Sequence, residues 1–422
     1  MTGPGEPDIF LRSQFDCAVA VADPMRSLPA HLPPKPAGRV VVIGAGKASA
    51  RMAEAVEAAW GPCEGLVITR YGYARPCRGI EIVEAAHPVP DAAGAAATQR
   101  ILDLLRGLGE GDFVLALISG GASSLLVAPA DGISLAGKQA VNAALLASGA
   151  PIGKMNVVRK HISGVKGGQL AAAAYPAGML ALLLSDVPGD DPAMIGSGPT
   201  VGDASSSADA RAALRDWSID VPGSVRAALA GPTGVVPPGD PRLSRVRNVV
   251  FAAPAQSLAA AADLARRADC AVQVWGDDIE GEARDVAADH AARVRGLLEA
   301  GTDRGRPLVI LSGGELTVTR RGAGVGGPNA EYALALAIAL DGATGVHALA
   351  CDTDGVDGAA EIAGAVIGPM TLALAGRTRI DAQDHLARND AHSFFAAVGG
   401  QVITGPTLTN VNDFRAILIR KG

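Results

Sequence analysis

The chain has 422 residues and a formal net charge of −6; 49% of its residues are hydrophobic and 19% are charged. This length exceeds one ordinary domain core, so we expect two domains, and the composition excludes disorder for the bulk of the chain. Nucleic-acid binding requires a basic face, and the negative net charge argues against that class of protein.

In chain order, the first half alternates apolar strands with helices around glycine turns. A helix is predicted over residues 8–23, and the stretch RVVVIGAGKASARMAEAVEAAW (39–60) predicts a buried strand, a glycine turn and an amphipathic helix. Further strands and helices are predicted over 65–70, 80–90, 91–108, 112–121, 137–149 and 178–191. Because the strands are continuously apolar, we expect a parallel sheet covered on both faces, with ligands at the carboxyl ends of its strands.

A stretch rich in proline and glycine, residues 229–246, lacks hydrophobic periodicity and is the predicted domain boundary. We therefore expect one domain over residues 1–240 and a smaller α/β domain over residues 241–422. In the second half, strands and helices are predicted over 246–253, 255–269, 271–276, 282–301, 306–318, 329–342, 346–355 and the end of 404–419.

The turn after the first long strand contains Gly44 and Gly46, as in a dinucleotide-binding fingerprint, but Ser49 replaces the third glycine. The next strand ends at Arg70, where an NAD site would require an acidic residue. Lys47 beside free amides at a helix start indicates an anion site, since the helix end alone would disfavour a cation. We predict Lys47 as catalytic and Gly44, Gly46 and Ser49 as phosphate-binding; a plain tight turn is the alternative.

The segment NVVRKHISGVKGGQLA (156–171) gathers Arg159, Lys160, His161 and Lys166 in eight positions. On a helix, Arg159 and Lys166 would share a face because they lie seven residues apart. We predict a clamp for phosphate or carboxylate, in which Arg159 is catalytic and Lys160 and Lys166 bind the anion. A solvated basic face is the alternative.

The segment LLLSDVPGDDPAMIGSGPT (182–200) ends a strand in acidic residues and continues into a loop of small residues. Carboxylates at such a strand end suit Mg²⁺ held near phosphates. We predict Asp186 as catalytic, Asp191 as a metal ligand, and Gly196, Ser197 and Gly198 as substrate-binding residues. An aspartate-rich surface turn is the alternative.

Ser-Gly-Gly follows an apolar run twice, at Ser119-Gly120-Gly121 and at Ser312-Gly313-Gly314. We expect both loops to bind anions through exposed amide groups, one in each domain. In the second half, further binding candidates are Glu315, Asn329, Asn410 and Asn412, and Asp352 and Asp354 are candidate metal ligands. Positioned cations, amides and a metal together indicate phosphoryl transfer.

The motifs GAGKAS, AAHPVPD, LISGGASSLL, NVVRKHISGVKGGQLA, LLLSDVPGDDPAMIGSGPT, SGGELTV, CDTDGVDG and LTNVNDF occur in this order along nearly the whole chain. In them the chain resembles the glycerate 2-kinases that carry a C-terminal MOFRL domain. The resemblance implies that ATP phosphorylates D-glycerate to 2-phosphoglycerate with a divalent metal. It also implies a Rossmann-like N-terminal domain, a smaller α/β domain with a MOFRL region at about 305–418, and a site in the cleft between them.

The chain departs from this family at one position, because Pro328 stands where many members have an arginine in the sequence GGRNQE. If an arginine is required there, Arg320, Arg321 or Arg159 are the candidates to supply it. Two alternatives remain open: an NAD(P)H-dependent hydroxypyruvate reductase, which is a former label of such relatives, and a non-catalytic sensor of sugar acids or nucleotides.

Other features bear on location and partners. Because acidic residues and prolines precede any apolar stretch at the N-terminus, we expect no signal peptide there, and no apolar run approaches the ~20 residues that a membrane span needs. The five cysteines have no CxxC spacing, so no disulfide framework or zinc site is expected. We expect a cytoplasmic enzyme that binds small molecules and neither membrane nor nucleic acid; a homodimer is left open.

Overall fold

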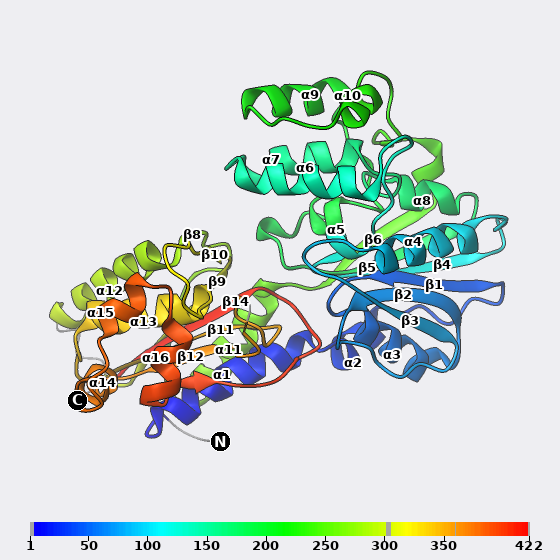
Figure 1. Ribbon diagram of the computed structural model, residues 1–422. Helices are drawn as coiled ribbons and strands as arrows, with labels where there is room; N and C mark the ends of the chain where they lie inside the picture. The colour runs from blue at the N-terminus through cyan, green and yellow to red at the C-terminus, as the bar shows by residue number, and fades with distance from the viewer. Residues whose placement is uncertain (1–3, 301–304, 359, 421–422) are drawn as a thin grey trace. The chain divides into compact units, whose positions relative to one another are not determined.

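The computed structural model describes residues 4–300, 305–358 and 360–420, and it divides into two compact units (Figure 1). One comprises residues 24–252 and is named the parallel-sheet unit. The other comprises the described residues of 1–23 and 253–422 and is named the mixed-sheet unit. Within the described residues, no helix has the length and apolar character needed to cross a membrane.

A sheet of six parallel strands forms the centre of the parallel-sheet unit, all of whose residues are described, in the order β3-β2-β1-β4-β5-β6. The strands are β1 (Val40–Ala45), β2 (Glu64–Arg70), β3 (Ile80–Ala85), β4 (Phe113–Ile118), β5 (Gly178–Leu184) and β6 (Val246–Ala252). The central strands β1, β4 and β5 are buried along nearly their whole length, which explains their continuously apolar sequence. The strand order reverses between β1 and β4, so their carboxyl ends form a topological switch point.

The helices of this unit fall into two groups. Those beside the sheet are α2 (Pro24–Ser27), α3 (Ser49–Trp60), α4 (Ala92–Leu105), α5 (Ala122–Leu125) and α8 (Gln169–Ala174). The others are α6 (Leu135–Ala147), α7 (Ile152–His161), α9 (Ser207–Asp216) and α10 (Gly223–Leu229), which stack away from the sheet and are named the helical lobe (Figure 1). The lobe has its own apolar core, to which Val141, Val158, Ala213 and Leu229 contribute.

The mixed-sheet unit has a larger and a smaller sheet. Its larger sheet has the order β13-β12-β11-β14-β9-β7, in which β7 and β9 are parallel and the other neighbours antiparallel. Its strands are β7 (Ala271–Gly276), β9 (Leu308–Gly314), β11 (Val346–Asp352), β12 (Gly364–Ile367), β13 (Gln401–Val402) and β14 (Asp413–Ile419). The short strands β8 (Gly281–Glu282) and β10 (Leu316–Thr317) pair separately. The described helices are α1 (Pro7–Ala22), α11 (Pro254–Arg267), α12 (Ala283–Glu299), α13 (Pro328–Leu340), α14 (Thr371–Arg377), α15 (Ala382–Ala387) and α16 (Ala391–Val398).

The predicted α/β class with a parallel first sheet and a second sheet in the C-terminal part is confirmed. The units divide at different residues from the predicted boundary of 240/241, because strand β6 completes the first sheet beside β5. The proline- and glycine-rich stretch instead lies within the parallel-sheet unit, where the amide of Val236 donates to the carbonyl oxygen of Gly167.

The opening helix is also placed differently from the prediction of a first domain over 1–240. Helix α1 belongs to the mixed-sheet unit, where Phe10, Leu11 and Phe15 pack into a core with residues of β9, β11 and β14. The hydroxyl of Ser257 donates to the carbonyl oxygen of Ala18, which ties α1 to α11. Gly301, the predicted end of the helix over 282–301, lies outside the described residues.

Candidate functional site

Two loops meet at the switch point of the parallel sheet. Ala45 and Ile118, the last residues of β1 and β4, are paired neighbours in the sheet. Beyond them, the amide of Lys47 donates to the carbonyl oxygen of Gly120 at 2.8 Å. The amide of Ser119 donates to the carbonyl oxygen of Ala45 at 3.2 Å. The chain therefore holds the Lys47 turn and the first Ser-Gly-Gly loop against each other, where ligands bind in sheets of this type.

Two buried serines fasten these loops together. The hydroxyl of Ser119 accepts from the amide of Ala48 at 3.1 Å and lies 3.0 Å from that of Ser49, which donates to the carbonyl oxygen of Leu117. Both side chains are fully buried. Gly44 lies inside β1, where a Cβ atom would come within 2.4 Å of the carbonyl oxygen of Leu117. We therefore correct the expectation for Gly44 and Ser49, because the Gly44 backbone packs against Leu117 and the Ser49 hydroxyl is used within the loops.

Lys47 and His87 lie beside the glycine loop. Gly121 has a φ of +82°, and the position of a Cβ atom on it would be 3.0 Å from the ring of His87 and 3.3 Å from Cγ of Lys47. Among the described residues, we find no acceptor for the amide N–H groups of Gly120 and Gly121. These amides are therefore available to an anion, and their anion-binding role stays a prediction. His87, which belongs to the AAHPVPD motif, was not among the predicted candidates, although it lies beside this loop.

Three cations gather behind this loop: Lys138, Arg159 and Lys166, named the cation cluster. Lys166 donates to the carbonyl oxygen of Ser123 at 2.8 Å, and Lys138 donates to that of Ile162 at 3.1 Å. Both lysines are only 1% exposed. In the described part of the chain, the guanidinium of Arg159 has no hydrogen-bond or ion-pair partner.

The electrostatics of this cluster are unusual for a protein interior. Burial, and secondarily the charge of Arg159, lower the pKa of Lys138 to about 7. Burial and the neighbouring cations lower the pKa of Lys166 well below its usual value, and burial lowers the pKa of Arg159. Buried charges are normally paired with opposite charges. A cluster of like charges without an acid inside it favours a bound anion.

The basic segment does not form one helical face, which corrects that expectation. Helix α7 ends at His161, so Lys166 lies in the following loop and Arg159 on the helix. Lys160 is buried and forms an ion pair with Asp203. The ring nitrogens Nδ1 and Nε2 of His161 lie 2.5 Å from Oγ1 of Thr233 and 3.1 Å from Oγ of Ser205. The side chains of Lys160 and His161 are therefore occupied by contacts within the protein, whereas Lys138, which sequence reasoning did not single out, joins the cation cluster.

The loop of Gly196, Ser197 and Gly198 closes over the same region. The hydroxyl of Ser197 lies 2.9 Å from that of Ser123 and donates to Oδ1 of Asn156 on α7. The carbonyl oxygen of Gly196 is a second, longer acceptor for Lys166, at 3.5 Å. This loop therefore joins the cation cluster to the chain after β4, and its substrate-binding role stays a prediction.

The predicted acidic residues of this unit follow β5, the neighbour of β4. Asp186 comes two residues after the strand ends and is partly buried. Asp191 is exposed, and its Oδ1 accepts from the amide of Ala193 at 2.9 Å in a local turn. Among the described residues, no three acidic, histidine or cysteine side chains gather as a ready metal site.

The second Ser-Gly-Gly differs from the first. Ser312, Gly313 and Gly314 are the last residues of β9 and pair with Arg415, Phe414 and Asp413 of β14. The carbonyl oxygen of Gly313 accepts from the buried guanidinium of Arg415. The expectation of two equivalent anion-binding loops is therefore wrong, because the backbone of the second belongs to a sheet.

A buried polar network lies beside this strand. Arg415 donates to Asp413 at 3.0 Å, and the side chain of Asn329 donates to the same carboxylate at 2.6 Å. Asp357 accepts from the amides of Asn329 and Ala330, both at 2.9 Å, and so caps helix α13. Burial raises the pKa of Asp413 against the opposing effect of Arg415. Asn329 is therefore the second residue of α13 and binds Asp413, and sequence reasoning did not single out Asp357, Asp413 or Arg415.

The remaining candidates of the mixed-sheet unit lie at the end of β11, in the turn after it and in loops. Asp352 and Asp354 each accept an amide two residues further along the chain, at 2.8 Å. Oδ1 of Asn410 accepts from the amide of Asn412, whose φ is +68°, and Oδ1 of Asn412 accepts from the amide of Asp413. Glu315 is exposed between β9 and β10. Their ligand roles stay predictions.

Known proteins place this geometry in a family. Residues 10–230 match a family described as a domain of unknown function, DUF4147, and residues 308–413 match the MOFRL family. The D-glycerate 2-kinase of Thermotoga maritima is 37% identical over 92% of this chain and 93% of its own length. The chain belongs to the MOFRL-type glycerate kinase family.

The family likeness extends to the structure. A crystal structure of the glycerate kinase from Thermotoga maritima matches with a TM-score of 0.87 and 35% identity, covering 99% of this chain and 100% of that one. A protein of Agrobacterium vitis is 49% identical over 97% of this chain and 94% of its own length, and it carries the provisional name hydroxypyruvate reductase.

Pro328, the departure from the family sequence, has a local structural role. It is the first residue of α13, where proline is favoured because its fixed φ suits a helix start and no amide hydrogen is needed. The preceding loop is held by Asn389, whose Oδ1 accepts from the amides of Arg321 and Gly322, and by Asp390, which accepts from that of Val325. In this member of the glycerate kinase family, the loop is therefore anchored without an arginine at position 328.

Proposed function

We propose that this protein transfers the terminal phosphoryl group of ATP to the 2-hydroxyl of D-glycerate, giving 2-phosphoglycerate and ADP. The observation that carries the proposal is the gathering of the Lys47 turn, the Ser119–Gly121 loop and the cation cluster at the switch point of the parallel sheet. The name of the Thermotoga maritima relative, D-glycerate 2-kinase, supports it.

Phosphoryl transfer needs little covalent participation by the protein, so the residues of the site mainly position the substrates and stabilise the negative charge of the phosphates. The 2-hydroxyl oxygen attacks the terminal phosphorus while the bond to the bridging oxygen of ADP breaks. We assign Lys47 and the amides of Gly120 and Gly121 to the transferring phosphoryl group. Arg159 and Lys166 would neutralise the remaining negative charge, and Asp186 would accept the hydroxyl proton.

The residues present fit a Mg²⁺ ion supplied with the nucleotide. Mg²⁺ is usually held by one or two carboxylates together with substrate phosphates, so a group of three protein ligands is not required. Asp186 or Asp191 after β5 would supply the carboxylate in this unit, and Asp352 and Asp354 stay candidates in the other. Neutralising phosphate charge is the chemistry that such an ion adds.

A coupled assay tests the proposal. Purified protein, D-glycerate, ATP and Mg²⁺ are incubated with enolase, and phosphoenolpyruvate is read directly. Enolase consumes 2-phosphoglycerate and not the 3-isomer, so a signal without added mutase supports both the kinase and the position of phosphorylation. A signal that appears only with mutase contradicts the 2-hydroxyl assignment.

Hydroxypyruvate reduction is the second candidate, favoured by the provisional name of the Agrobacterium vitis relative. Against it, the guanidinium of Arg70 at the end of β2 lies 4.6 Å from the centre of the Tyr73 ring, where an NAD-binding sheet would present a carboxylate to the ribose. Oxidation of NADH in the presence of hydroxypyruvate, together with a silent kinase assay, would replace the proposed function by this one.

A further inference from the structure

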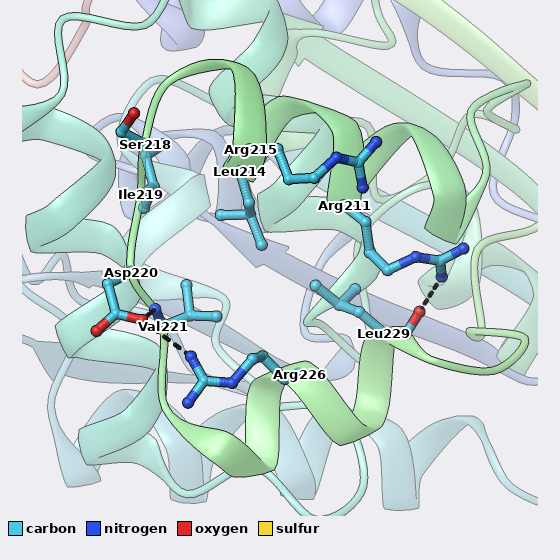
Figure 2. Close-up of a pocket in the computed structure, with 9 residues that line it drawn as sticks. All are labelled: Arg211, Leu214, Arg215, Ser218, Ile219, Asp220, Val221, Arg226 and Leu229. Atoms are coloured by element: carbon cyan, nitrogen blue, oxygen red, sulfur yellow. Dashed lines mark hydrogen bonds and ion pairs between the residues drawn. The ribbon is translucent and has the colours of Figure 1, made fainter.

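The helical lobe contains a pocket of about 480 Å³, formed by α9, the turn over residues 217–222 and α10 (Figure 2). Small-molecule sites typically measure roughly 300–1,000 Å³, so the pocket has a suitable size. Its apolar lining consists of Leu214, Ile219, Val221 and Leu229, which belong to the core of the lobe. Figure 2 shows Leu214, Val221 and Leu229 pointing toward the middle of the pocket.

Three arginines line the same pocket. Arg211 on α9 donates to the carbonyl oxygen of Leu229, the last residue of α10, so it is held in place. Arg226 on α10 pairs with Asp220 at 2.9 Å. Arg215 is exposed, and we find no hydrogen-bond or ion-pair partner for it in the described part of the chain. Three guanidinium groups against one carboxylate give an apolar pocket with a positive rim.

This combination fits one class of ligand. A guanidinium group offers planar, paired donors that match carboxylate and phosphate oxygens. The apolar lining would be covered by a hydrocarbon or aromatic body, because burying apolar surface is favourable. The complementary ligand is therefore a small organic anion with an apolar body.

The pocket is connected to the cation cluster through His161. Ser205, which precedes α9, and Thr233, which follows α10, contact the two ring nitrogens of this one side chain. His161 ends α7, two residues after Arg159. Asp203, just before α9, also binds Lys160. The segment before α9 and the segment after α10 are thus both attached to the C-terminal end of α7, which carries Arg159.

We propose that the pocket between α9 and α10 binds a small organic anion with an apolar body, a carboxylate or a phosphate monoester, and that its occupancy changes substrate affinity at the cation cluster. The second part rests on the proposed function, whereas the binding itself does not. Neither the family likeness nor the names of the relatives assigns a ligand to this pocket.

Calorimetric titration of phenyl phosphate into the full-length protein tests the binding. We expect saturable binding that the Arg215→Ala/Arg226→Ala variant weakens about tenfold or more, since charge-assisted contacts are lost. Arg106→Ala, which removes an exposed arginine outside the pocket, is the matched control and should leave affinity unchanged. Inorganic phosphate and phenol, which lack the apolar body and the charge respectively, should each bind more weakly. Absence of saturable binding, or equal affinity in wild type and double variant, overturns the site.

A second titration tests the coupling. The affinity for D-glycerate is measured with and without saturating phenyl phosphate, and we expect a change of about fivefold or more in wild type but not in the double variant. An unchanged affinity in a protein that binds both molecules overturns the coupling. If D-glycerate neither binds nor is phosphorylated, the proposed function fails, while the binding result for phenyl phosphate stands by itself.

Discussion

The hydroxyl oxygens of Ser49 and Ser119 lie 3.0 Å apart, fully buried, and join the first turn of α3 to the loop after β4. Ser119 also accepts from the amide of Ala48, so one hydroxyl serves both loops at the switch point. The position of the Lys47 turn therefore depends on two side chains that face the protein interior.

Ser119→Ala should destabilise the protein by roughly 1–3 kcal/mol, because the amide of Ala48 and the hydroxyl of Ser49 lose a buried partner. Urea unfolding measures the loss, and kinase turnover should fall with it because the Lys47 turn loosens. Ser224→Ala, at an exposed position of α10, is the control and should change neither. A fully stable and active Ser119→Ala protein would show that the backbone bonds alone hold the loops.

Lys47→Met should reduce turnover by on the order of a thousandfold or more, since a charge that stabilises the transferring phosphoryl group is lost. The enolase-coupled assay measures turnover, and the thermal unfolding midpoint checks that the fold persists. Lys35→Met removes an exposed lysine that binds the carbonyl oxygens of Trp60 and Pro62, and it should retain wild-type turnover. Equal turnover in both variants would remove Lys47 from the site.

Lys138→Met should change the pH dependence of stability. The pKa of Lys138 is about 7 in the folded protein and 10.5 in the unfolded chain. Between these values the unfolded chain binds a proton that the folded chain does not, so wild-type stability rises with pH. The buried charge therefore lowers the free energy of unfolding by its full amount below pH 7, and this loss disappears as the pH rises toward 10.5. Relative to wild type at the same pH, the variant should therefore gain most in unfolding free energy at pH 6, on the order of a few kcal/mol. The gain should be smallest at pH 10.

Urea unfolding of both proteins at several pH values measures this difference. Lys154→Met, which changes an exposed lysine on the neighbouring helix α7, provides the control and should leave the pH profile as it is in wild type. A Lys138→Met difference that does not vary with pH would contradict the burial of an uncompensated ammonium group.

Asp357→Ala should destabilise the mixed-sheet unit by roughly 1–3 kcal/mol, because the amides of Asn329 and Ala330 at the start of α13 are left without an acceptor in a buried position. Asp381→Ala removes a comparable cap from the exposed start of α15, where water can replace the carboxylate, and should cost less. Chemical unfolding followed by circular dichroism compares the two. Equal losses would mean that burial of the first cap has no energetic consequence.

Removal of divalent metal should abolish kinase turnover while leaving the fold intact. The expected reason is that the phosphate charge of the nucleotide is no longer neutralised. Turnover is measured after treatment with EDTA and again after excess Mg²⁺ is restored, with the circular dichroism spectrum recorded in each state. Turnover that persists without metal would contradict the proposed metal-binding role of Asp186 or Asp191.

The sequence determined the α/β class and the two-part organisation, because these follow from local patterns, and it predicted where the candidate site lies. Continuously apolar strands predict a parallel sheet, and Lys47, directly after the glycine turn at a strand end, predicts an anion site there. The same local reasoning failed where two segments look alike. Ser119-Gly120-Gly121 leaves its strand and exposes amides, whereas Ser312-Gly313-Gly314 pairs with β14.

Only the tertiary structure decided which charges act together. Lys138 falls on the apolar stripe of α6 with Val141 and Leu145, a signal that it is buried, but no sequence spacing brings it to Arg159 and Lys166. Lys160 has the same residue type as Lys166, yet Asp203 neutralises it from a segment more than forty positions away. Whether a buried charge is paired depends on partners distant in sequence, which local periodicity does not encode.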